Sequence, residues 1–186
     1  MITKALKSHK KLVNKLLKDE KLIEFFEKTS TTITEALQLG RKVYIIGNGG
    51  SATDAMHFAG ELTGHYLKNR RSLACEALVD PGIITCIAND YGYDKVFSHQ
   101  LKGRLFSGDV VILLSTSGNS KNILEAIKFC DEYNALSISL LGKEGGIMKK
   151  RALMEYVVPS DETARIQEIH KLILHAWAEH LDEHFE

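Results

Sequence analysis

Two segments far apart in the sequence carry the side chains that could do chemistry together. The first, residues 47–61, is GNGGSATDAMHFAGE and combines a glycine-rich turn, a hydroxyl and a His/Glu pair. The second, residues 167–175, is QEIHKLILH and adds a glutamine and a histidine. Together they predict an anion-binding pocket that carries acid–base or metal chemistry.

The glycine-rich turn follows a short apolar run that ends in glycine. Gly47, Gly49 and Gly50 permit a tight turn and close approach of the backbone to a ligand. Ser51 and Asp54 have the spacing of a capping box, so we expect Ser51 to cap the following helix, whose first N–H groups would face an anion. A glycine-rich connection without a ligand is the alternative. The turn lacks the lysine of a P-loop and matches the dinucleotide pattern G-x-G-x-x-G imperfectly, which disfavours a nucleotide-binding protein.

A second polar turn, STSGNS at residues 115–120, follows another apolar run. Its four hydroxyls belong to Ser115, Thr116, Ser117 and Ser120. Hydroxyl and backbone N–H groups can bind a phosphate without a strong positive field, so this turn favours a small phosphorylated metabolite. The simpler interpretation is that Asn119 or Ser120 only caps the next helix, which would not need four hydroxyls.

The remaining candidates lie on two predicted helices. His57 and Glu61 are four residues apart and share one helix face, where they could meet one ion or substrate, although an exposed helix pair is the simpler interpretation. Gln167 and His175 lie eight residues apart on the late helix, about 12 Å along its axis. A shared site would therefore need two extended side chains, a bent helix or contributions from two chains. A packed or surface histidine is the alternative for His175.

The secondary structure around these residues alternates between strands and helices. Continuous apolar strands separated by helices indicate a mostly parallel five-stranded sheet covered on both faces, a three-layer α/β sandwich. The predicted strands are 43–47, 73–79, 110–115, 136–142 and 156–159. The predicted helices are 51–66, 93–106, 119–133, 146–152 and 162–184. A single domain over residues 1–186 fits this length, with residues 1–39 as a helical extension, divided near Asp19, that packs on the core or on a neighbouring subunit.

Composition narrows the function classes. The chain carries 24 basic and 24 acidic residues, so it offers no electrostatic footprint for nucleic acid. No apolar run approaches the about 20 residues that span a bilayer, and the N-terminus does not resemble a secretion signal. Cys75, Cys86 and Cys130 lack C-x-x-C spacing and are predicted to be buried thiols in a reducing cytoplasm.

From Gly40 onward, and in its N-terminal helices, the chain resembles the sedoheptulose 7-phosphate isomerases of the sugar-isomerase (SIS) fold group. The resemblance is carried by GNGGSATDAMHFAGEL, the AND at 88–90, STSGNS and RIQEIHKLILH. It implies a SIS, flavodoxin-like fold and conversion of sedoheptulose 7-phosphate to D-glycero-D-manno-heptose 7-phosphate, which feeds heptose synthesis for lipopolysaccharide or related glycans. It also implies a cytoplasmic homotetramer with active sites at subunit interfaces.

The resemblance also assigns site residues. Substrate contacts are implied for the glycine turn, the 88–90 segment and the serine loop, namely Asn48, Gly49, Gly50, Ser51, Asn89, Asp90, Ser115, Thr116, Ser117 and Ser120. Glu61 and Gln167 would contact both substrate and metal, and His57 and His175 would complete a site for one Zn²⁺ per subunit. His65 departs from the pattern, because relatives commonly have arginine there; Arg70 and Arg71 lie nearby.

The chemistry expected of this site is proton transfer between adjacent carbons. Glu61 is the candidate carbon base and His175 the candidate acid for the sugar oxygens. A non-catalytic SIS module that binds a sugar phosphate and regulates a partner is the main alternative. A zinc hydrolase that uses His57, Glu61 and His175 is a further alternative, but the chain lacks H-E-x-x-H and the serine loop would have no role.

Overall fold

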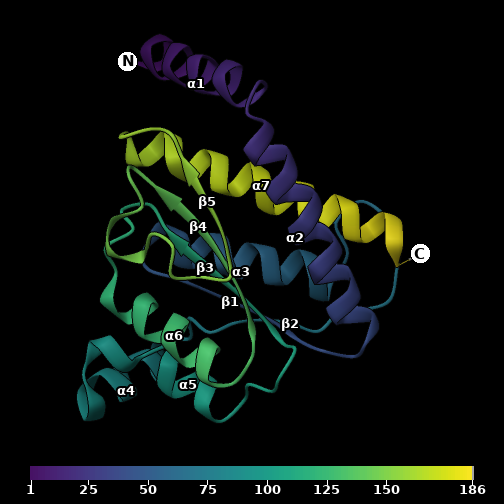
Figure 1. Ribbon diagram of the computed structural model, residues 1–186, viewed down its shortest axis with the longest axis vertical. Helices are drawn as coiled ribbons and strands as arrows, with labels where there is room; N and C mark the ends of the chain where they lie inside the picture. The colour runs from purple at the N-terminus through teal and green to yellow at the C-terminus, as the bar shows by residue number, and fades with distance from the viewer. Residues whose placement is uncertain (186) are drawn as a thin grey trace.

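The computed structural model describes residues 1–185 as helices packed on both faces of one parallel sheet (Figure 1). The expected domain boundary at 186 lies outside the described residues. The strands are β1 (Val43–Gly47), β2 (Cys75–Ala77), β3 (Val110–Ser115), β4 (Leu136–Gly142) and β5 (Met154–Val158). They are ordered β2-β1-β3-β4-β5, and all neighbouring pairs are parallel. The predicted three-layer α/β fold is confirmed.

The helices divide between the two faces of the sheet. They are α1 (Ile2–Leu16), α2 (Glu20–Gln38), α3 (Gly50–Thr63), α4 (Pro81–Tyr91), α5 (Ser98–Lys102), α6 (Lys121–Glu132) and α7 (Thr163–His184), with 3-10 turns η1 (Tyr93–Lys95) and η2 (Gly146–Met148). Val43 and Ile45 of β1 pack with α2, α3 and α7, whereas Tyr44 and Ile46 pack with α4, α5 and α6. Alternate residues of each central strand therefore serve two separate cores, which explains the continuous apolar runs.

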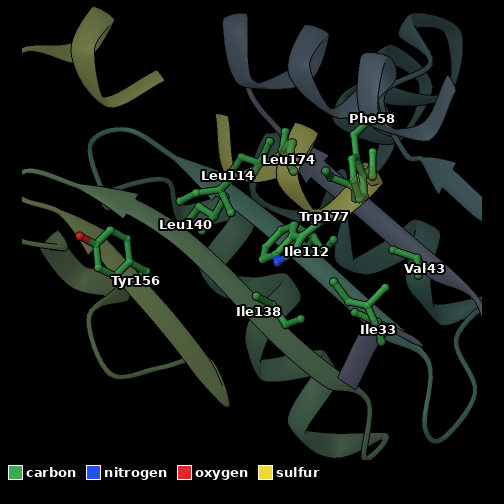
Figure 2. Packing of buried hydrophobic residues seen from close by; sticks show 14 of the residues in the cluster. Ile33, Val43, Phe58, Ile112, Leu114, Ile138, Leu140, Tyr156, Leu174 and Trp177 are labelled. Carbon is green, nitrogen blue, oxygen red and sulfur yellow. The ribbon is translucent and has the colours of Figure 1, made fainter. Parts of the chain in front are cut away.

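Trp177 of α7 anchors the helices on the first face (Figure 2). Its ring is fully buried and lies near Phe25 of α2 and Phe58 of α3. The indole N–H donates to Thr29 Oγ1 at 3.1 Å, so its polar atom is also satisfied. Because one side chain touches all three helices, the positions of α3 and α7 relative to the sheet are fixed together.

The N-terminal segment forms two helices, as predicted, and they divide at Asp19. The Asp19 carboxylate accepts from the Lys21 N–H at 3.1 Å and thereby caps α2. Helix α2 packs on the sheet, with Ile33 fully buried. Helix α1 contacts α7 through His9, whose Nδ1 lies 2.6 Å from Glu168 Oε2, and it buries Leu12 and Leu16 in the core.

Three element predictions need correction. Helix α4 was not expected, although Asp80 caps it by accepting from the Ile83 N–H at 2.9 Å and Pro81 opens it. This Asp-Pro pair is the start signal that could have revealed it. The helix expected over 93–106 is only η1 followed by the short α5, and that over 146–152 is the single turn η2.

The cysteine prediction holds only in part. All three cysteines are free; Cys130 is buried and Cys75 half-buried, but Cys86 is exposed on α4. The expectation of three buried thiols is therefore wrong for Cys86, because α4 turns this residue away from the sheet. Within residues 1–185, no helix is long and apolar enough to cross a membrane.

Candidate functional site

The glycine turn and the serine loop lie next to each other at the carboxyl edge of the sheet. Strands β1 and β3 are neighbours, with Gly47 paired with Leu114, and the two loops leave their ends. The chain passes from β1 to β2 on one side and then returns to β3 on the other. Ligands of open α/β sheets bind at this kind of switch point.

The glycine turn starts α3 earlier than expected. Gly49 has φ 56° and ψ −121°, a conformation that favours glycine, and it occupies the N-cap position. Ser51 is therefore buried inside the first turn instead of capping the helix, and no side chain caps this end. The predicted capping box is wrong, because Asp54 is one turn into the helix and bonds elsewhere. The N–H groups of Ser51 and Ala52 donate to the Asn48 and Gly49 carbonyls at 3.0 Å each, so the anion-binding capacity that the sequence suggested can rest only on the N–H groups that precede them.

The serine loop is held by its own hydroxyls. Ser115 Oγ accepts from the Gly118 N–H at 3.1 Å and lies 3.2 Å from Ser120 Oγ. Ser117 Oγ accepts from the Asn119 N–H at 3.1 Å, and Thr116 is half-buried between them. Ser120 occupies the N-cap position of α6 but makes no side-chain capping bond. Simple helix capping therefore does not explain these hydroxyls.

Two residues that the sequence did not single out, Asn122 and Tyr93, join the loops. Asn48 and Asn122 exchange amide hydrogen bonds of 3.0 and 2.9 Å, and the Tyr93 hydroxyl donates to Asn48 Oδ1 at 2.9 Å. Asn122 is 2% exposed, and this burial, which requires its amide to be hydrogen-bonded, is visible only in the fold. Nothing in the sequence pattern marks Tyr93.

Asn89 and Asp90 lie in the last turn of α4, at the exposed end of that helix. Asn89 Nδ2 donates to Asp90 Oδ1 at 2.9 Å. Their segment reaches the glycine turn through Tyr93, which follows α4 and bonds to Asn48. This predicted pair therefore lies near the edge of the site.

His57, Glu61 and His175 converge between α3 and α7. His57 Nε2 lies 2.8 Å from His175 Nε2 and 3.3 Å from Glu61 Oε1. The side chains of His57 and Glu61 are 41% and 21% exposed, so both remain accessible. Tyr66, another residue that the sequence did not single out, stacks on the His175 ring with centroids 5.5 Å apart.

Gln167 meets α3 at a different point from His175. Its Nε2 donates to Asp54 Oδ2 at 2.8 Å, while Lys171 Nζ lies 3.0 Å from Asp54 Oδ1. These side chains, with Ala164 and Glu168, line a pocket of about 230 Å³. Within one chain, the two predicted late-helix residues therefore flank successive turns of α3 and do not meet at one point.

The donor set at His57 has the composition of a zinc site. Two imidazole nitrogens and one carboxylate oxygen are ligands that Zn²⁺ accepts, and both imidazoles present Nε2 toward the same point. Among the described residues, however, no three His, Cys, Asp or Glu side chains are arranged as a formed metal centre. Gln167 would have to leave Asp54 to join this group.

The arginines near His65 are already engaged. The Arg70 guanidinium is buried and pairs with Asp182 at 2.6 Å, and Arg71 lies over the Phe185 ring at 4.9 Å. His65 itself is exposed. Arg70 therefore cannot replace an arginine at position 65 without breaking a buried ion pair.

Comparison with known proteins places the chain in a family. A family model described as the SIS domain matches residues 6–142. Phosphoheptose isomerase 1 of Campylobacter jejuni serotype O:2 is 45% identical over 188 residues, covering 100% of this chain and 98% of that protein. Phosphoheptose isomerase of Helicobacter pylori strain P12 is 42% identical, covering 100% of this chain and 96% of its own.

Solved structures agree with this placement. A phosphoheptose isomerase from Francisella tularensis superposes with a TM-score of 0.91 at 30% identity, covering 98% of this chain and 96% of that chain. One from Neisseria gonorrhoeae gives a TM-score of 0.85 at 37% identity, covering 98% of this chain and all of that one. The chain therefore belongs to the SIS domain family and, within it, to the phosphoheptose isomerases.

Proposed function

We propose that this chain is an aldose–ketose isomerase that converts sedoheptulose 7-phosphate to D-glycero-D-manno-heptose 7-phosphate for heptose biosynthesis. One observation carries the proposal beyond family membership. A single helix, α3, begins at an anion-binding turn and carries His57 and Glu61 further along, where His175 joins them. The substrate needs both features, because its phosphate is on C7 and its reacting carbons are C1 and C2.

The phosphate end of the sugar binds at the edge of β1 and β3. The hydroxyls of Ser115, Thr116, Ser117 and Ser120, with backbone N–H groups at the starts of α3 and α6, supply the donors. Asn48, Gly49 and Gly50 form the opposite wall, and Asn89 and Asp90 contact the sugar from the end of α4. Anchoring the far end in this way holds C1 and C2 in place for proton transfer.

Glu61 and His175 move the protons. The Glu61 carboxylate takes the proton from C1 of the ketose and returns it to C2, and the intervening species is an enediolate. His175 exchanges the protons on the two sugar oxygens. Each group is expected to contribute about 10²–10⁴-fold to the rate.

A zinc ion fits the same cluster. His57, Glu61 and His175 would hold it, with Gln167 as a fourth ligand after it releases Asp54. When bound, the ion would act as a Lewis acid that stabilises negative charge on the enediolate oxygens. Elemental analysis of the purified protein should find about one zinc per chain. Full activity after chelation would show that zinc is not required.

The protein acts in the cytoplasm as a homotetramer with its sites at subunit interfaces. The three free thiols favour a reducing compartment. The exposed side chains of Leu17, Ile23 and Leu172 belong to a largely apolar groove of about 250 Å³ formed by α1, α2 and α7. A face of this kind suits contact with another copy. Light scattering after size exclusion measures the assembly, and a monomer would contradict it.

The decisive experiment is incubation with sedoheptulose 7-phosphate followed by product identification by NMR. The wild type should form the aldoheptose 7-phosphate, whereas Glu61→Gln should lose at least about 100-fold in kcat while it stays folded. Near-normal turnover by the variant would remove Glu61 as the base. Binding without any turnover by the metal-loaded wild type would favour the non-catalytic SIS module instead.

A further inference from the structure

We propose that Tyr66 is a positioning residue for His175, held against the imidazole by the buried ion pair of Arg70 and Asp182. The proposal rests on the proposed function, because it assigns a role around the candidate acid. Tyr66 lies in the segment 64–72 between α3 and β2, whose sequence gave no hint of a link to α7. The contacts of this segment carry the inference.

Tyr66 covers one face of the His175 ring. The two ring planes are nearly parallel, with an interplanar angle of 14° and centroids 5.5 Å apart. His57 meets the same imidazole at its edge, at 69° and 5.1 Å. The imidazole is therefore restrained on one face by Tyr66 and at Nε2 by His57. A ring held on two sides keeps its nitrogen in one direction, which proton transfer requires.

Asp182 fixes the segment that carries Tyr66. Its Oδ2 accepts from the N–H groups of Leu67 at 2.5 Å and Lys68 at 2.9 Å, the two residues that follow Tyr66. Asp182 lies on α7 two turns beyond His175. Helix α7 therefore carries His175 and also holds, through Asp182, the loop that carries Tyr66. Both residues of the stacked pair are positioned by the same helix.

Arg70 joins this support to the end of α3. Its Nε pairs with Asp182 Oδ1 at 2.6 Å, and both side chains are buried, at 0% and 1% exposure. Its Nη2 donates to the Glu61 carbonyl and its Nη1 to the Leu62 carbonyl, each at 2.8 Å. These carbonyls belong to the last turn of α3, where backbone acceptors lack helical partners. One guanidinium thereby links the turn that contains Glu61, the Tyr66 segment and α7.

Burial of this ion pair is the physical reason for its rigidity. Burial alone would raise the pKa of Asp182, but the N–H groups of Lys68 and Leu67 and the Arg70 guanidinium outweigh it and lower that pKa. The carboxylate is therefore ionised at neutral pH and keeps all of its donors. If one partner were lost, the other would be left as an unpaired buried charge, which is strongly unfavourable. The network is therefore expected to stay intact in the folded protein.

The test compares Tyr66→Ala with Tyr66→Phe, which keeps the stacked ring, and with Tyr133→Ala as a control. Tyr133 also stacks on an aromatic ring, Phe129, at 4.3 Å, but it ends α6 and lies outside the site. Tyr66→Ala should lower kcat about 10–100-fold with little change in KM, since misplacement of about 1 Å can cost this much. Tyr66→Phe should stay within about twofold of the wild type, and so should Tyr133→Ala.

NMR provides a second measurement that does not need activity. The ring protons of His175, assigned from their absence in His175→Gln, should show the upfield shift of a stacked ring. That shift should disappear in Tyr66→Ala and persist in Tyr66→Phe. Normal kcat together with unchanged His175 resonances in Tyr66→Ala would overturn the inference. Failure of the wild type to isomerise the sugar would instead overturn the proposed function, and the ring-proton result would still report on the contact.

Discussion

His57 and His175 face each other through Nε2 atoms that are 2.8 Å apart, although 118 positions separate them in the sequence. The contact exists because α3 and α7 lie side by side on the same face of the sheet, with Phe58 and Trp177 packed together one and two residues further along. Aromatic packing thus sets the distance between two polar groups.

Replacement of His175 tests whether the imidazole takes part in turnover. His175→Gln should lower kcat by about 10²–10⁴-fold, because the general acid for the sugar oxygens is lost. The measurement is steady-state conversion of sedoheptulose 7-phosphate. His184→Gln is the matched control, since His184 is exposed at the end of the same helix and bonds only to the His180 carbonyl at 2.8 Å among the contacts described. Equal activities of the two variants would exclude His175 from catalysis.

Two glycines of α3 should respond differently to alanine. A Cβ at Gly50 would lie 2.5 Å from Gln167 Nε2, so Gly50→Ala should push the Gln167 amide away from Asp54. We expect about a 10-fold or larger fall in kcat/KM with little change in stability, because only the end of a flexible side chain must move.

Gly60→Ala supplies the comparison for Gly50→Ala. A Cβ at Gly60 meets nothing within 4 Å, and alanine suits a helix better than glycine by about 0.5–1 kcal/mol. The variant should therefore be slightly more resistant to urea and fully active. Unchanged activity in both variants would mean that the contact of the Gln167 amide with Asp54 does not matter for turnover.

The Arg70–Asp182 pair should dominate the electrostatic contribution to stability. Asp182→Asn leaves the buried guanidinium without a counter-charge and should cost about 3–5 kcal/mol in the free energy of unfolding. Glu125→Gln removes the partner of Lys95 and Lys128 on the surface and should cost less than about 1 kcal/mol. Denaturant titration of both variants measures the difference, and similar small losses would contradict the assignment.

His170 should make the protein less stable in mild acid. Burial lowers the pKa of His170 to about 4, although its bond to the Leu141 carbonyl and the charge of Asp54 act in the opposite direction. The unfolded chain takes up a proton near pH 6.5 while the folded chain resists it. Stability is therefore lost as the pH falls from about 6.5 to about 4, by about 3 kcal/mol in total.

His170→Gln isolates this contribution. The glutamine amide can still donate to the Leu141 carbonyl, but it does not titrate. Urea unfolding at several pH values should give a flatter dependence for the variant than for the wild type. Parallel curves over this range would mean that other groups set the acid sensitivity.

Local sequence patterns were enough to predict the central strands and several of the polar groups at their ends. The runs 43–47, 110–115 and 136–142 became strands with the predicted bounds, because both of their faces are apolar. The four-residue spacing of His57 and Glu61 guaranteed a common helix face. Turn glycines and clustered hydroxyls likewise marked two of the loops at the carboxyl edge of the sheet.

Other features could not be obtained from local patterns. The start of α3 depended on the backbone of Gly49, which moved Ser51 into the helix. Asn122 and Tyr93 are positioned by Asn48, which lies 74 and 45 residues away in the sequence. Tyr66 is positioned by His175, which lies 109 residues away. No periodicity in a single segment encodes such contacts.

The pairing of side chains between α7 and α3 depends on how the chain folds in three dimensions. The sequence placed Gln167 and His175 on one helix, but it could not say that the first would bond to Asp54 and the second to His57. That choice follows from how the two helices are aligned along each other, and burial of Trp177 against α2 and α3 fixes the alignment. Local propensity forms helices, whereas the packing of distant apolar surfaces sets their relative positions. The geometry of this site is a consequence of that packing.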